Sequence, residues 1–100
     1  MLILEAQRDL SLAERFHFCI ETVFGLDALE ESDGLVMKYE PCRGSRIVVN
    51  RFNRGNEIYI APEGDDVDAR LMSAVTVPMY GTRPNKFIHD HVRKNIILYA

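Results

Sequence analysis

The sequence is poor in cysteine, in basic residues and in long hydrophobic runs. Two cysteines with no Cys-x-x-Cys pair exclude the dense disulfide framework of small secreted domains, so we expect a reducing compartment. No apolar run approaches the roughly 20 residues that span a bilayer. Glu5 and Asp9 near the N-terminus fit neither a signal peptide nor a basic transit peptide. A formal net charge of -3 gives no electrostatic basis for binding nucleic acid. We therefore expect neither a membrane nor a nucleic-acid partner.

The sequence also lacks a nucleophile motif, a phosphate-binding loop and the ligand spacing of a zinc site, so a conventional enzyme is not expected. It has no repeat, low-complexity tract or linker. With 47% hydrophobic residues in 100, the chain has the composition of one domain over residues 1–100.

Apolar residues at steps of three and four from Leu2 to Phe24 predict one helix that ends at Gly25. The run from Ser11 to Glu14 is a capping-box pattern, so the alternative is a helix that begins at Ser11. We favour the longer helix.

Strand signals follow in series, separated by short polar turns that indicate an antiparallel meander. The expected strands are 35–40, 46–52, 57–61 and 70–77, and the acidic segment 27–33 is a short edge strand or a loop. Beyond Pro84, apolar residues from Phe87 to Tyr99 recur at helical spacing and predict a second helix. The fold class is therefore α+β, in the order helix, meander, helix.

Both helices are expected on one face of the sheet, because each has one apolar stripe and the sheet has one apolar face to offer. The opposite face then stays open. Alternation along the hairpin 44–62 places Asn50, Phe52, Glu57 and Tyr59 on that open face. An amide, two aromatic rings and a carboxylate have the composition of a contact surface.

The hairpin is similar in sequence to the frataxin family. Its Gly44–Arg51 strand resembles the family's Gly-Ser/Thr-x-x-hydrophobic-Ile-Asn-Lys/Arg strand, and Glu57–Pro62 resembles the Gln-Ile/Val-Trp-Leu strand that follows a polar turn. Gly34-Leu35-Val36 resembles the family's Gly-Val-Leu, and the order of the expected elements agrees. Tyr59 stands in place of the family's tryptophan and keeps an aromatic ring with a polar tip.

The resemblance implies an accessory protein of iron–sulfur cluster assembly, an iron chaperone or regulator to which a ferroxidase activity is sometimes attributed. In the family, carboxylates of the first helix and first strand bind ferrous or ferric iron weakly at the surface, with water completing the shell. The corresponding carboxylates here are Glu5, Asp9, Glu14, Glu21, Asp27, Glu30, Glu31 and Asp33.

The resemblance also implies that the open face docks on the cysteine desulfurase and the iron–sulfur scaffold protein. The corresponding residues are Asn50, Phe52, Glu57 and Tyr59, joined by Arg51, Asn53 and Arg70. A monomer is expected. The implied location is a mitochondrion or mitochondrion-derived organelle, without a visible transit peptide, and the alternative is bacterial cytoplasm.

A function of another class fits the same open face. The chain could be a small non-enzymatic inhibitor or adaptor, for example of phage origin, whose sheet blocks a protein partner without any metal. Iron binding separates this alternative from the frataxin-like function.

Overall fold

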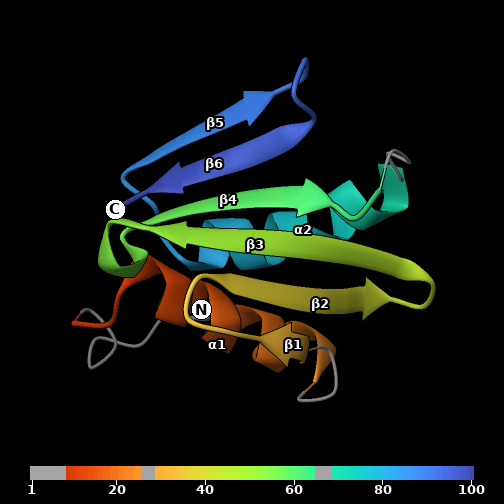
Figure 1. Cartoon of the computed structure of the whole chain (residues 1–100), viewed down its shortest axis with the longest axis horizontal. Coiled ribbons are helices and arrows are strands. Elements are labelled where there is room, and N and C mark those ends of the chain that lie inside the picture. The colour runs from red at the N-terminus through yellow and green to blue at the C-terminus, as the bar shows by residue number, and fades with distance from the viewer. Residues whose placement is uncertain (1–8, 26–28, 65–68) are drawn as a thin grey trace.

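The computed structural model of the chain describes residues 9–25, 29–64 and 69–100. In this part of the chain a helix is followed by four strands, a second helix and two further strands (Figure 1). The helices are α1 (Leu12–Phe24) and α2 (Ala69–Gly81), and a short 3-10 turn is η3 (Asn53–Gly55). The strands are β1 (Leu29–Ser32), β2 (Val36–Cys42), β3 (Ser45–Phe52), β4 (Glu57–Pro62), β5 (Lys86–Asp90) and β6 (Asn95–Tyr99).

The strands form one antiparallel sheet in the order β1-β2-β3-β4-β6-β5. Strands β2, β3 and β4 match the expected strands 35–40, 46–52 and 57–61 to within two residues. The acidic segment contributes the edge strand β1, which was one of its two interpretations. The predicted meander is therefore confirmed from β1 to β4.

The second half of the chain differs from the prediction. Segment 70–77, expected as a strand, lies in α2, and segment 87–99, expected as a helix, forms the β5–β6 hairpin. In α2 the buried side chains of Leu71, Val75 and Met79 recur at every fourth position, which places them on one helix face. The order helix, meander, helix is therefore wrong, because α2 lies between β4 and β5.

The sequence did not predict the β5–β6 hairpin for two reasons, its turn and its apolar run. The turn 91–94 contains neither Gly nor Pro; instead the Asp90 Oδ1 accepts the backbone N–H groups of Val92 at 3.0 Å and Arg93 at 2.9 Å. In β6, Ile96 and Leu98 are buried and Ile97 between them is only 9% exposed, so the strand shows no alternation of apolar and polar residues. Periodicity alone does not separate such a run from a helix.

Helix α1 begins at the capping box. The backbone N–H of Glu14 donates to the Ser11 hydroxyl, and the backbone N–H of Ser11 donates to the Glu14 carboxylate, both at 3.2 Å. Ser11 is extended, and Asp9 and Leu10 precede the helix in a turn and a bend. The alternative start at Ser11 is confirmed, and the favoured continuous helix from Leu2 is wrong at residues 9–11.

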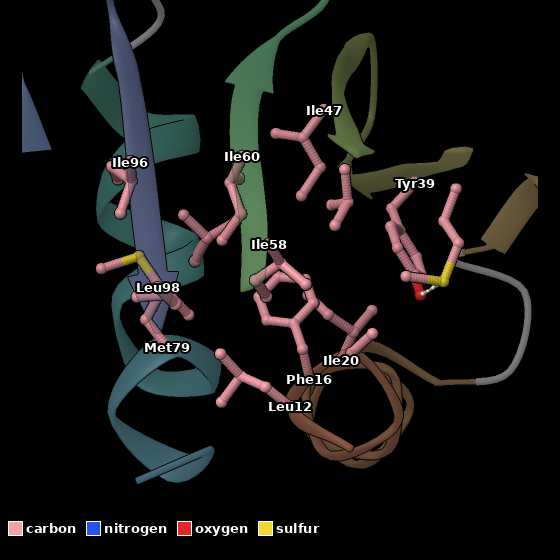
Figure 2. Close-up of a cluster of buried hydrophobic side chains, with 14 of the residues drawn as sticks. Leu12, Phe16, Ile20, Tyr39, Ile47, Ile58, Ile60, Met79, Ile96 and Leu98 are labelled. Atoms are coloured by element: carbon pink, nitrogen blue, oxygen red, sulfur yellow. Dashed lines mark hydrogen bonds between the residues drawn. The ribbon is translucent and has the colours of Figure 1, made fainter. Parts of the chain in front are cut away.

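Both helices pack on the same face of the sheet, as predicted, and the fold class α+β is confirmed. Figure 1 shows α1 and α2 behind the strands. Figure 2 shows the core between the layers, where side chains of both helices meet those of the central strands. The labelled residues, all buried, are Leu12, Phe16, Ile20, Tyr39, Ile47, Ile58, Ile60, Met79, Ile96 and Leu98.

The turn η3 is packed directly against the start of α1. Gly55 has a φ of +87°, and a Cβ atom there would lie 2.8 Å from the Ser11 Oγ. Gly44 also has a positive φ, of +79°, but a Cβ atom there would have no neighbour within 4 Å. A substitution at Gly44 therefore introduces backbone strain alone, whereas a substitution at Gly55 introduces both backbone strain and a steric clash.

We expect Gly55→Ala to lower the free energy of unfolding more than Gly44→Ala does. Backbone strain should cost each variant about 1–2 kcal/mol, and displacement of the Ser11 cap should cost Gly55→Ala about 1 kcal/mol more. Urea denaturation of the two variants and the wild type measures the difference. Equal losses would show that η3 does not constrain the cap.

Candidate functional site

The sheet face that points away from the helices, the open face, carries a row of side chains across its central strands. Residues directly opposite each other in antiparallel strands point to the same face. Asn50 of β3 lies opposite Val36 of β2 and opposite Tyr59 of β4, and Tyr59 in turn lies opposite Ile97 of β6. The row therefore crosses four neighbouring strands.

A second row lies beside the first, nearer the end of the hairpin. Phe52 of β3 lies opposite Glu57 of β4, Glu57 lies opposite Tyr99 of β6, and Tyr99 lies opposite Lys86 of β5. The residues that alternate with these along the strands, such as Ile58 of β4, point into the core. Both rows therefore face away from the helices. The predicted placement of Asn50, Phe52, Glu57 and Tyr59 on the open face is confirmed.

Aromatic rings form the centre of this surface. The ring centroids of Phe52 and Tyr59 lie 4.7 Å apart with a tilt of 59°, within the range of favourable aromatic pairs. A hydrogen bond with Tyr99 is the main cause of a raised pKa at the Tyr59 hydroxyl. The Lys86 ammonium lies 5.6 Å from the centroid of the Tyr99 ring. Phe52 nevertheless remains 49% exposed.

The open face therefore includes residues that the sequence did not assign to it. Tyr99, Lys86 and Ile88 belong to it through β5 and β6, which were expected to be helical. The signal that could have found them is the run Asn95–Tyr99, which is rich in β-branched and aromatic residues. Its pairing with β4 extends the surface beyond the β3–β4 hairpin.

Three residues of the predicted docking set do not lie with the others. Arg51 is opposite the buried Ile58, so it points to the helix side, where its guanidinium donates to the backbone carbonyl of Asp33. Asn53 is in η3, and it lines with Arg51 a hollow of about 450 Å³ beside the start of α1. Arg70 is in α2, on the helix layer, instead of in a strand.

The acidic residues proposed from the resemblance do not converge in the described part of the chain. In residues 9–25, 29–64 and 69–100, no group of three or more His, Cys, Asp or Glu side chains is placed to hold a metal ion. Glu14 binds the backbone N–H of Ser11, and Glu21 lies 2.6 Å from the Nε2 of His17. Both carboxylates therefore have local partners.

The other acidic positions are less informative. Asp9 is exposed in the turn before α1, and Glu30 and Glu31 are in β1, where only their backbone is described. Glu5 and Asp27 lie outside the described residues. A shared iron site therefore stays a prediction for this segment.

Asp33 has the best-defined structural role of the acidic set. Its Oδ1 accepts the backbone N–H of Leu35 at 2.8 Å and that of Val36 at 2.7 Å, which closes the turn between β1 and β2. These hydrogen bonds, first Leu35 and then Val36, lower the pKa of the Asp33 carboxyl below its usual 3.8. A carboxyl with a lowered pKa in the folded state stabilises the fold above its unfolded-state pKa, and this contribution is lost as the pH falls through the folded-state pKa.

We expect Asp33→Asn to lose less stability on acidification than the wild type. The Asn oxygen still accepts both N–H groups but does not titrate, so its curve should be flatter between about pH 5 and pH 2. Urea denaturation over that range measures the slope, with Asp33→Ala as the variant that lacks the acceptor at every pH. Parallel curves for Asp33→Asn and the wild type would contradict this role.

No helix in the described residues is long and apolar enough to cross a membrane. No family model, curated protein or solved structure matches the chain. Function is therefore inferred from the chemistry of the open face.

Proposed function

We propose that the protein is a non-enzymatic adaptor that docks a partner protein on the open face of its sheet. The observation that carries this proposal is the Phe52–Tyr59 aromatic pair, whose rings come from the paired strands β3 and β4 and which still leaves Phe52 half-exposed. The exposed half of the Phe52 ring contacts water in the chain alone, and a bound partner would bury it, which favours association.

The composition around the pair supports recognition of a protein. Tyr is among the residues most enriched in binding hot spots, and Asn50 beside it offers an amide that both donates and accepts hydrogen bonds. The ring of Tyr59 is restrained by Phe52 and by its hydrogen bond with Tyr99. The Tyr59 side chain would therefore lose little conformational entropy when a partner binds, which favours affinity.

We propose the cysteine desulfurase and iron–sulfur scaffold assembly as the partner. The support is the sequence of the β3–β4 hairpin, which resembles the frataxin hairpin at Asn50 and at the aromatic position Tyr59. The place of α2 between β4 and β5 differs from the element order that the resemblance implied, so the hairpin alone supports this partner.

We expect Tyr59→Ala to weaken binding of the purified desulfurase–scaffold complex by about 30-fold or more, the usual loss at a hot spot of about 2 kcal/mol. Asn50→Ala should weaken it less. Val77→Ala is the matched control, because Val77 is 56% exposed on α2, on the other side of the molecule. Biolayer interferometry measures the affinities. Wild-type affinity for both open-face variants would contradict docking of this complex.

Weak iron binding is the second candidate function, and the sequence around β1 favours it. Glu30, Glu31 and Asp33 lie within four positions, and like charges so close in sequence are relieved by a cation. This activity would make the chain a frataxin-like accessory protein, in a mitochondrion-derived organelle or in bacterial cytoplasm.

We expect ferrous iron to broaden the amide NMR signals of residues 30–33 before those of the distant acidic residues Glu63 and Asp90. The reason is the higher negative charge density around β1. Equal broadening at all acidic residues, or no broadening, would contradict iron binding around β1. The metal-free adaptor would then be the remaining proposed function.

A further inference from the structure

The two edges of the sheet differ in how they are protected. The edge strand β1 has four residues, two of them adjacent glutamates, and its register is interrupted by an irregularity between Leu29 and Glu31. Charges, shortness and bulges are the devices by which proteins block an edge from pairing with another chain. The other edge strand, β5, pairs with β6 over five consecutive residues without interruption, and it contains neither Pro nor Gly. It has no such protection at its centre.

The centre of β5 carries an exposed apolar side chain on each face. Ile88 is 37% exposed on the open face, and Phe87 is 42% exposed on the helix side. The ring of Tyr80, from α2, lies 6.0 Å from the Phe87 ring and is itself exposed. A hollow of about 290 Å³ is lined by both rings and by the buried Met79 and Leu98. An added strand would cover apolar side chains above and below the edge.

The sequence of β5 is complementary to itself. Lys86 and Asp90, at its two ends, point to the same open face as Ile88 at its centre, because they lie opposite Tyr99, Asn95 and Ile97 of β6. If two copies of β5 pair antiparallel about Ile88, each Lys86 lies opposite an Asp90. The two ion pairs then flank an Ile88–Ile88 contact, and Phe87 lies opposite His89 on the helix side.

We propose that a second copy of this chain docks on β5 in this register, so that one antiparallel sheet runs through both copies. The two-fold axis would pass through the Ile88 pair, perpendicular to the sheet, which makes the contact isologous and closed. Sliding the register by one pairing step would place Lys86 or Asp90 opposite the apolar Ile88. Only the proposed register pairs both charges. The contact shares Lys86 and Ile88 with the rim of the open face but does not include the Phe52–Tyr59 pair that carries the docking function, so the inference does not depend on that function.

Sedimentation velocity of the full chain over a range of concentrations tests the proposal. Lys86→Glu places a glutamate opposite Asp90 at both ends of the contact, and we expect it to weaken self-association about tenfold or more. Adding Asp90→Asn removes this repulsion and should recover most of the loss. The amide oxygen of the introduced asparagine can still accept the backbone N–H groups of Val92 and Arg93, so the hairpin turn is preserved.

Arg43→Glu is the matched control, because it changes the net charge equally at an exposed turn between β2 and β3. Three results would overturn the proposal: a wild-type chain that stays monomeric up to about 1 mM, self-association that Lys86→Glu and Arg43→Glu weaken equally, or dilution-dependent NMR shifts that fall outside β5. Tyr59→Ala should leave self-association unchanged. A failure of the self-association proposal can therefore be distinguished from a failure of the proposed docking function.

Discussion

The structure depends on the burial of one face of the sheet under both helices. Phe16 of α1 is fully buried in this contact, where its ring meets that of Tyr39 from β2 edge to face at a centroid distance of 6.1 Å. The Tyr39 hydroxyl lies 2.7 Å from the Nδ1 of His17 and also contacts the sulfur of Met37, so the one polar atom of this large buried side chain has partners. Because both helices occupy the same face, no helix of the described chain covers the other.

The sequence predicted the first half of this arrangement because its signals are local. The alternation from Val36 to Pro62, and the capping box at Ser11 and Glu14 that marked the alternative helix start, each specify structure through neighbouring residues. The second half depends on the tertiary context. Residues 96–98 are all apolar, because Ile96 and Leu98 are buried on the helix side and Ile97 lies between its neighbours Tyr59 and Ile88 on the other. A strand that is buried on both faces lacks the alternation of apolar and polar residues by which a strand is recognised in sequence.

The same distinction explains how much of the candidate site could be predicted. Asn50, Phe52, Glu57 and Tyr59 were found because strand alternation places them together whatever the helices do. Tyr99 and Lys86, which complete the aromatic centre, come from the mispredicted hairpin. Proximity in sequence does not place a residue on the open face. Arg51 adjoins Asn50 and Phe52 but points to the other face, where it binds the backbone carbonyl of Asp33.

The central claim is that the open face, and not the helix layer, contacts a partner protein. Its most direct test replaces Tyr59 with a photo-crosslinking derivative of phenylalanine, which keeps an aromatic ring at this position, in cells that express the chain, with the same replacement at the exposed Val77 of α2 as the comparison. The account predicts a discrete crosslinked adduct with another protein from position 59 and none from position 77. No adduct from position 59, or the same adduct from both positions, would contradict it.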